Sequence, residues 1–307
     1  MDLEATSTVR VICAFLVLLP TLCGLALDSL VLVALYKGWK TFRSISFYVI
    51  ITQILGCSFC LLFVFLYLVF PIILTGVQYM GDGFIFYKVP LYVHSAAFLV
   101  TLHLTFLLTI NRLTIFVFPR VNGILFSAKN TIILSGIVWI YTIFTMILSE
   151  LIGCRLEFSK DEFYIWLDCA EEKAKGFEFD KLLTFQHQVV AVLMCLMYFV
   201  IYIKIRTSQH NVDDGLLKRE TAFLVQTIPA SALFVVNLAM FRIIPIVGIT
   251  GYARFFVFAF ANLTIIVGVM SSSIMLFIFN KEVREHVRSL FWNNTTPTVL
   301  VAPLARF

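Results

Sequence analysis

The sequence predicts an all-α membrane protein, built as a bundle of seven transmembrane helices. Hydrophobic residues make up 61% of the 307-residue chain and charged residues only 13%, with a mean hydropathy of +0.97. This leaves too few charges to cover a water-soluble surface. The apolar residues also gather in long continuous runs without two-residue alternation. Because lipid cannot satisfy backbone amides, such runs predict helices and exclude a transmembrane β-barrel.

Each apolar run is long enough to cross a bilayer, since a helix needs ~20 apolar residues for a hydrocarbon core of ~30 Å. We expect helices at 11–36, 45–70, 89–118, 130–152, 183–206, 220–245 and 254–279. No linker rich in Pro, Gly or Ser divides the chain, and no internal repeat is present. Residues 1–307 are therefore expected to form a single domain.

Three elements need separate arguments. The run at 11–36 exceeds the ~7–15 residues of a signal-peptide core and has no small-residue cleavage site after it, so we expect it to remain as the first helix. Within 220–245, Pro229 is expected to kink the helix. Residues 281–292 place apolar side chains on one helical face and charged ones on the other, which predicts a short amphipathic helix on the inner leaflet. An irregular basic tail is the alternative.

The Lys and Arg residues predict which end of the bundle faces the cytoplasm. Fourteen of the 23 fall in loops on one side. The other side holds the loop 153–182, in which eight acids outnumber five bases, and four scattered cations. Basic residues of short loops stay in the cytoplasm, so the N-terminus is expected outside and the C-terminus inside. The net charge of +5 then reflects topology and gives no indication of nucleic-acid binding.

The cysteines predict one disulfide and no metal site. Cys154 and Cys169 lie in the loop 153–182, which the topology places in an oxidising compartment. A bond between them would close a loop of about 15 residues and stabilise it by ~3 kcal/mol; two free thiols are the alternative. Zinc-ligand spacing, G-x-S-x-G and a Walker glycine loop are all absent from the sequence. We therefore expect no metal, no cofactor and no enzymatic activity.

One segment carries a resemblance to a known superfamily. Asn111-Arg112 followed by Pro119 resembles the Asp-Arg-Tyr…Pro segment of rhodopsin-like G-protein-coupled receptors, and Trp139 is similar to the tryptophan of their fourth helix. The resemblance implies that these three residues near the end of the third helix form a switch that meets a heterotrimeric G protein. Asn111 can hydrogen-bond but cannot neutralise Arg112, which predicts a weak inactive-state lock. The alternative for Arg112 is an interfacial cation that reaches solvent.

The chain departs from rhodopsin-like receptors at several positions. Tyr87 stands 25 residues before Arg112, where most such receptors have a disulfide Cys. Asp28 and Gly56 stand in place of the family's Asn and Asp, and the Asn-Pro-x-x-Tyr motif falls on residues 272–276, which read SSIML. The bound sodium ion and the tyrosine switch of those receptors are therefore not expected here.

The chain also resembles another group of receptors, the nematode serpentine chemoreceptors of class X or XA. The resemblance is carried by residues 42–48 (FRSISFY), by the Asn-Arg pair with Phe118-Pro119, and by residues 220–226 (ETAFLVQ). It implies a plasma-membrane receptor, with a sensory cilium as one location, that couples an extracellular small molecule or peptide to a heterotrimeric G protein. The alternatives are a rhodopsin-like neuropeptide or neurotransmitter receptor and, in another class, a seven-helix transporter or channel. The lack of inverted repeats argues against a transporter.

Polar residues within the spans are the candidate ligand contacts. A helix turns 100° per residue, so His94 and Thr101 share a face of the third helix with Arg112 and are expected to face the inner cavity. The candidates on the fifth and sixth spans are His187, Asn237 and Arg242. Intramembrane polar groups are functional candidates by default. A hydrogen bond between helices is the alternative, and we expect one for His103, on the opposite face of the third helix.

Three residues are expected to be structural. Asp28 is expected to form a polar centre with Asn262 or with the Ser271–Ser273 run across the bundle. A proton or ion site is the alternative for this carboxylate. Trp139 joins this set through its resemblance to the fourth-helix tryptophan of rhodopsin-like receptors.

Overall fold

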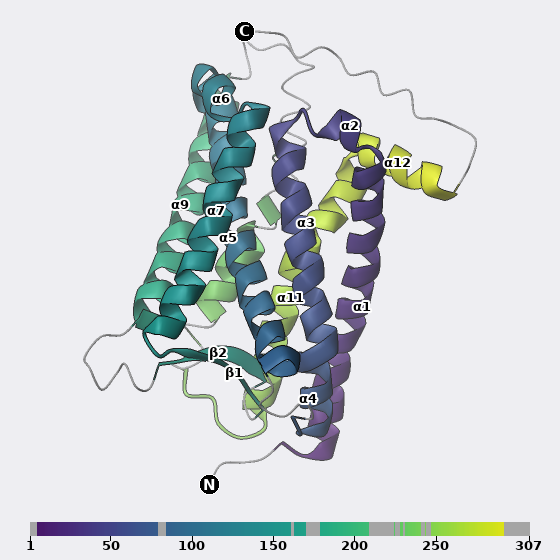
Figure 1. The fold of residues 1–307 in the computed structure, drawn as a ribbon, viewed down its shortest axis with the longest axis vertical. Helices are drawn as coiled ribbons and strands as arrows, with labels where there is room; N and C mark the ends of the chain where they lie inside the picture. Colours follow the sequence, from purple (N-terminus) through teal and green to yellow (C-terminus); the bar gives the residue numbers. More distant parts are fainter. Residues whose placement is uncertain are drawn as a thin grey trace.

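Six long apolar helices form most of the part of the chain that the structure describes (Figure 1). The computed structural model describes residues 5–78, 84–160, 163–169, 179–208, 224, 228–229, 231–240, 243 and 247–291. Each of the six helices is long and apolar enough to cross a membrane. A shorter apolar helix, Ser231–Met240, lies within the span predicted at 220–245, most of which falls outside the described residues.

The elements follow one another along the chain as a helical bundle with one hairpin. The long helices are α1 (Ser7–Lys37), α3 (Ser46–Val64) continued by the π-helical η1 (Phe65–Val69) and α4 (Phe70–Thr75), α5 (Val89–Val117) preceded by the π-helical η2 (Phe84–Lys88), α7 (Ala128–Leu151), α9 (Phe179–Ser208) and α11 (Ala253–Phe279). The short elements are α2 (Trp39–Phe42), α6 (Pro119–Leu125), β1 (Arg155–Ser159), β2 (Tyr164–Asp168) and α12 (Lys281–Phe291).

Side chains at the helix ends explain where several helices begin and end. Oγ1 of Thr6 accepts a hydrogen bond from the N–H of Val9 at 3.5 Å, and Oγ of Ser127 accepts one from the N–H of Asn130 at 3.3 Å. These side chains satisfy backbone donors that have no partner within the first turn. Gly76 ends α4 with a φ of 73°, a left-handed conformation that glycine adopts without steric cost.

Each of the six long helices is longer than the span predicted for it. The second continues past residue 70 to Thr75, the third begins at Phe84 instead of 89, and the fifth begins at Phe179 instead of 183. Bilayer thickness sets only a minimum length for a spanning helix. Helical structure therefore continues wherever the apolar sequence continues, until a glycine or a loop ends it.

A β-hairpin lies between α7 and α9, and the sequence analysis predicts neither this hairpin nor the short helices α2 and α6. β1 and β2 pair antiparallel, with Arg155 opposite Asp168. The structure joins Cys154 and Cys169 in a disulfide, immediately before β1 and after β2. The predicted cysteine pair therefore closes the base of the hairpin.

The bundle has two distinct ends (Figure 1). At one, which we call the hairpin end, β1 and β2 lie at the same end as the start of α1. At the other, which we call the α12 end, lie α2, α6 and α12. All the loops with the predicted excess of Lys and Arg that the structure describes lie at the α12 end.

Asn280 sets the direction of α12 relative to α11. Its Oδ1 accepts a hydrogen bond from the N–H of Val283 at 3.1 Å, and its Nδ2 donates to the Tyr48 hydroxyl of α3 at 2.8 Å. The Tyr48 hydroxyl in turn donates to Oε2 of Glu282 at 3.0 Å. Val283 and Val287 are buried, so the apolar face of the predicted amphipathic segment packs against the bundle.

Candidate functional site

Arg112 lies inside the α12 end of the bundle. Its side chain is 1% exposed, and its guanidinium carbon lies 4.8 Å from the centre of the Phe47 ring of α3. The quadrupole of an aromatic ring attracts a cation over its face by about 0.5–2 kcal/mol, depending on desolvation. This burial disagrees with the alternative of an interfacial cation that reaches solvent. The predicted switch arginine is held against α3.

Asn111 contacts a different element, α6. Its Nδ2 donates to Oδ1 of Asn122 at 3.1 Å, and Oγ1 of Thr114 donates to the same oxygen at 3.0 Å. Oδ1 of Asn111 has no hydrogen-bond partner among the described residues, so the asparagine does not hold Arg112. Pro119 is the first residue of α6, where its missing N–H costs nothing. The segment from Asn111 to Pro119 therefore fastens α6 to the end of α5.

His94 and Thr101 share a buried face of α5, and this face packs against α3. The His94 ring lies edge-on to Phe65 of η1, which continues α3, with 5.4 Å between ring centres. Neither residue lines a pocket that the structure describes. Both ring nitrogens of His94 and Oγ1 of Thr101 are buried without a hydrogen-bond partner among the described residues, and the expectation that they contact a ligand stays a prediction. Helical periodicity determines which residues share a face, but not which neighbour that face meets.

A polar cluster joins α5, α7 and α9 near the middle of the bundle. The Tyr141 hydroxyl donates to Oε1 of Gln186 at 2.7 Å, and Nε2 of Gln186 lies 3.2 Å from Nε2 of His103. Nδ1 of His103 lies 2.7 Å from the carbonyl oxygen of Leu99. Because a carbonyl only accepts, His103 carries its proton on Nδ1 and accepts from Gln186 at Nε2. His103 thus makes a hydrogen bond between helices.

His187 lies beside this cluster on α9. Its ring centre is 6.5 Å from that of His103, and its Nε2 is buried without a hydrogen-bond partner among the described residues. A buried polar atom of this kind is available to a donor or acceptor brought by a ligand. His187 is therefore placed where a ligand contact is feasible, although neither described pocket is lined by it.

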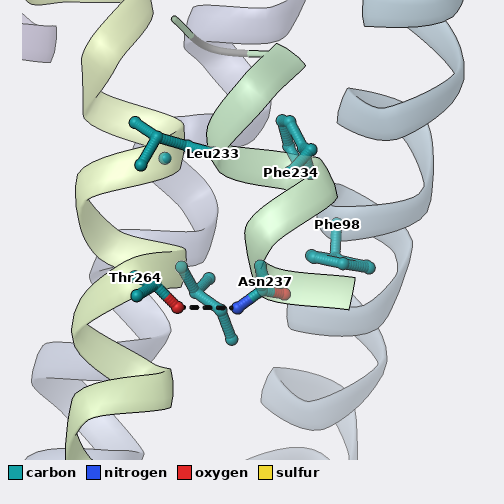
Figure 2. Close-up of a pocket in the computed structure, with 7 residues that line it drawn as sticks. Phe98, Leu233, Phe234, Asn237 and Thr264 are labelled. Atoms are coloured by element: carbon teal, nitrogen blue, oxygen red, sulfur yellow. Dashed lines mark hydrogen bonds between the residues drawn. The ribbon is translucent and has the colours of Figure 1, made fainter. Parts of the chain in front are cut away.

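A narrow pocket lies between α5, the helix Ser231–Met240 and α11 (Figure 2). It is lined by Phe98, Leu233, Phe234, Asn237, Thr264, Ile265 and Gly268, and the space between them is too narrow for a water-sized sphere. We call it the Asn237 pocket. Nδ2 of Asn237 donates to Oγ1 of Thr264 at 3.0 Å, whereas Oδ1 is buried without a hydrogen-bond partner in the described part of the chain. Among the predicted ligand contacts that the structure describes, Asn237 alone lines this pocket.

Tyr198 links three helices on the α12 side of the Asn237 pocket. Its hydroxyl lies 3.2 Å from Oγ1 of Thr109 on α5 and 3.2 Å from Oγ of Ser231. The sequence analysis missed this contact, because a single tyrosine in an apolar run has no periodic pattern to mark it. The three hydroxyls tie the helix Ser231–Met240 to α5 and α9.

The Phe163 side chain is buried between α1 and α11 at the hairpin end of the bundle. It is 0% exposed, with the ring 5.3 Å from that of Phe255 and the Arg10 guanidinium carbon 5.6 Å away. Nδ2 of Asn262 donates to the carbonyl oxygen of Phe163. Phe163 has a φ of 59°, a left-handed conformation that is strained for a bulky residue. Asn262, one predicted partner of Asp28, holds the hairpin instead.

Two tyrosines add further contacts between the hairpin and the helices. The Tyr87 hydroxyl in η2 accepts a hydrogen bond from the N–H of Phe158 at 3.1 Å. The Tyr164 ring stacks on Phe258 of α11, 4.9 Å between ring centres, and burial raises the pKa of its hydroxyl. Together with Phe163, these contacts dock the hairpin across the bundle.

Asp28 forms a polar centre between α1, α3 and α11. Ser58 donates to one carboxylate oxygen at 2.5 Å, and Ser273 donates to the other. The carboxylate is fully buried. Of the two predicted partners, the serine run supplies the contact, because Asn262 lies nearer the hairpin end and bonds Phe163.

Trp139 lies outside this polar centre, which corrects the prediction. Its side chain is 38% exposed on the surface of the bundle, and its indole N–H donates to Oε1 of Gln53 at 2.9 Å. An indole can keep its apolar body in lipid while its N–H is bonded to protein. The tryptophan therefore joins α7 to α3 at the lipid-facing surface.

Two predictions remain, the ligand contact of Arg242 and the absence of a metal site. Arg242 lies outside the described residues. Within the described ranges, no group of three His, Cys, Asp or Glu side chains is arranged to hold a metal ion.

Comparison with known proteins identifies the family of this helical bundle. The family model of the serpentine type 7TM GPCR chemoreceptor Srx matches residues 18–280, from α1 to the end of α11. No curated protein matches the chain. The family match confirms the predicted resemblance to nematode serpentine chemoreceptors. It favours a chemosensory receptor over a rhodopsin-like neuropeptide or neurotransmitter receptor and over a transporter or channel, and it points to a receptor rather than an enzyme. The chain therefore belongs to the Srx family of serpentine chemoreceptors, multi-pass membrane proteins of the G-protein-coupled receptor superfamily.

Proposed function

We propose that this receptor couples an extracellular small molecule or peptide to a heterotrimeric G protein at the plasma membrane, with a sensory cilium as its location. The observation that carries the proposal is Arg112, a buried cation over the Phe47 ring at the α12 end of the bundle. The residue before it, Asn111, supplies no negative charge. The proposed G-protein site consists of Arg112, Asn111 and Pro119.

The proposed mechanism is a shift between two packings of the bundle. In the closed packing, Arg112 lies over Phe47, and Tyr198 lies within hydrogen-bond distance of Ser231. Opening the α12 end for a G protein requires these contacts to break. A ligand that binds the open packing better by ~1–3 kcal/mol changes the populations 5- to 150-fold, and this is comparable with the energy of a single cation–π contact.

The orientation of the bundle follows the charges of its loops. The α12 end carries exposed cations in short loops, among them Arg43, Arg120 and Lys129, and such residues remain in the cytoplasm. The hairpin end, with the Cys154–Cys169 disulfide, then faces the oxidising exterior. A ligand would arrive from the hairpin end and a G protein from the α12 end.

The proposed ligand contacts differ in how directly they act. All four described candidates, Asn237, His187, His94 and Thr101, present buried polar atoms that have no partner among the described residues. We propose Asn237 and His187 as direct contacts. His94 and Thr101 lie on the face of α5 that packs against α3, and they are proposed to act by changing how α3 and α5 fit together. Arg242 stays a proposed contact from its place in the sixth span.

Basal nucleotide exchange tests the proposal without a known ligand. Purified receptor in vesicles is mixed with a heterotrimeric G protein, and the rate is compared with that of the G protein alone. Arg112→Gln should reduce the receptor-dependent rate to near zero, whereas Arg120→Gln, an exposed arginine on α6, should leave it unchanged. Phe47→Leu removes the aromatic face from Arg112 and should raise the rate. Equal rates for all variants at equal receptor amounts would contradict the proposal.

A further inference from the structure

We propose that the Asn237 pocket binds a small neutral ligand that donates an N–H or O–H to Oδ1 of Asn237. This inference rests on the proposed function, because it names the chemical class of the ligand for the same receptor. It excludes carboxylates and molecules that carry acceptors alone. Alcohols, phenols and primary amides with an apolar body fit the description.

The orientation of the Asn237 amide follows from its neighbours. The hydroxyl of Thr264 donates its proton to the carbonyl oxygen of Ala261 at 2.7 Å. Thr264 therefore accepts the hydrogen bond from Nδ2 of Asn237 at 3.0 Å, and the Ala261 oxygen, 3.4 Å from Nδ2, accepts as well. A flipped amide would place its oxygen against two acceptors. The NH₂ group is thus fixed toward α11, as Figure 2 shows, and Oδ1 is turned away from Thr264.

Oδ1 of Asn237 is therefore an acceptor that a ligand can use. The residue is 2% exposed, and Oδ1 has no hydrogen-bond partner among the described residues. A buried acceptor without a donor destabilises the packing around it, and a donor supplied by a ligand removes that penalty. An ether or a carboxylate would bring a second acceptor against the first.

The pocket walls select a neutral and apolar ligand body. Phe98 and Phe234 provide aromatic surface, and Leu233 and Ile265 provide aliphatic surface. None of the described lining residues carries a positive charge, so a buried anion would be uncompensated and strongly disfavoured.

The narrowness of the pocket links binding to helix movement. No water-sized sphere fits in the space between Leu233 and Gly268 and their neighbours. A ligand must therefore move the helix Ser231–Met240 away from α5 and α11. The same helix carries Ser231, which contacts Tyr198, so occupation of the pocket would favour the open packing.

Three matched probes test the ligand class. Para-fluorobenzyl alcohol, its methyl ether and para-fluorobenzoate are titrated against purified receptor in lipid nanodiscs, and bound probe is measured by fluorine NMR with empty nanodiscs as the blank. The alcohol should bind at least about tenfold more tightly than the ether, because the ether leaves Oδ1 without a donor. Benzoate should bind more weakly still. Equal affinities for alcohol and ether, tighter binding of benzoate, or no binding by any probe would overturn the proposal.

Two variants locate the binding to this pocket. Asn237→Leu keeps the side-chain size and removes the acceptor, so the preference for alcohol over ether should fall to about twofold or less. Gly268→Ala narrows the pocket without a clash, because the new Cβ would lie 3.6 Å from Cβ of Leu233. It should weaken alcohol binding at least about fivefold. Its control is Gly136→Ala on α7, where no heavy atom lies within 4 Å of the new Cβ.

Gly268→Ala keeps the inference testable if Asn237→Leu does not fold, and equal alcohol affinity in the Gly268→Ala and Gly136→Ala receptors would overturn it. The binding measurement contains no G protein. Binding of the alcohol with no change in nucleotide exchange would therefore contradict the proposed function and support the ligand class. Exchange driven by ligands that have no donor would support the function and contradict the ligand class.

Discussion

The Tyr87 hydroxyl and the backbone N–H of Phe158 form a hydrogen bond of 3.1 Å that connects the start of the third spanning helix to the hairpin. Tyr87 stands where most rhodopsin-like receptors have a disulfide cysteine. The disulfide of this chain, Cys154–Cys169, lies within the hairpin itself. A non-covalent contact thus occupies the place of a covalent one, and among the described residues no disulfide joins the hairpin to the third spanning helix.

Tyr87→Phe should loosen the hairpin. The substitution keeps the ring and removes only the acceptor for the Phe158 N–H, at a cost of ~1–3 kcal/mol for a buried donor left without a partner. Amide exchange at Phe158 should become about 5- to 100-fold faster. Tyr92→Phe is the control, because Tyr92 lines a groove between α5 and α7 instead of contacting the hairpin. Unchanged exchange at Phe158 would mean that the hydrogen bond contributes nothing to docking.

Phe163→Gly should destabilise the docked hairpin even though it relieves backbone strain. Glycine at a φ of 59° removes a steric cost of ~1–2 kcal/mol, whereas loss of a fully buried phenylalanine ring costs ~3–5 kcal/mol. The packing term is larger, so the melting temperature of the purified receptor should fall. Asn262→Leu, which removes the donor to the Phe163 carbonyl, should lower it as well. A rise in melting temperature for Phe163→Gly would show that strain outweighs packing.

Asp28→Asn should be tolerated better than Asp28→Leu. Both carboxylate oxygens accept hydroxyl hydrogen bonds, from Ser58 and Ser273. An asparagine keeps one acceptor, and a serine hydroxyl can turn to accept from its NH₂, so the expected loss is ~1 kcal/mol of unfolding free energy. Leucine leaves both serines without an acceptor and should cost more.

Denaturation of the detergent-solubilised receptor measures the Asp28 variants, with Ser29→Ala as the control on the same helix. Ser29 donates to the Leu25 carbonyl within α1 and does not contact the carboxylate. Equal losses for Asp28→Asn and Asp28→Leu, both well above ~1 kcal/mol, would show that the negative charge itself is required. That result would favour the proton or ion site over the structural polar centre.

Asn111→Asp should lower basal signalling. A carboxylate cannot donate to Oδ1 of Asn122 as the Asn111 amide does, and it lies beside the buried Arg112 cation. An ion pair there would strengthen the closed packing, and basal nucleotide exchange should fall about 3- to 10-fold. Ala128→Asp, which adds the same negative charge at an exposed position of the same end, is the control. Unaltered exchange at equal surface expression would argue against a weakened lock.

The spans could be predicted from the sequence because bilayer thickness imposes a length on every apolar helix. The helix ends could not, because residues such as Phe70–Thr75 remain apolar and helical beyond that length. The hairpin was missed for another reason. It is held by contacts between distant residues, such as Asn262 with Phe163, 99 positions apart, and no local pattern contains that information.

In the candidate site, too, local sequence patterns could be predicted, whereas contacts between distant residues could not. The proposed switch residues Asn111 and Arg112 stay a prediction from a short segment, whereas the shared face of His94 and Thr101 could be predicted from helical periodicity. Periodicity gave no direction for that face, which packs against α3. The orientation of the Asn237 amide depends on Thr264 and Ala261 of another helix, so only the folded chain reveals which of its atoms faces the pocket.

Two consecutive residues of α3, Phe47 and Tyr48, connect the third spanning helix to the end of the seventh at the α12 end of the bundle. Phe47 carries the Arg112 guanidinium of the third spanning helix, and the Tyr48 hydroxyl accepts from Asn280 at the end of the seventh. The two rings also touch, with 5.3 Å between their centres. The contacts of Arg112 and those of the first turn of α12 therefore meet at two adjacent side chains of one helix. We expect any rearrangement of Arg112 that displaces Phe47 to reach α12 through Tyr48.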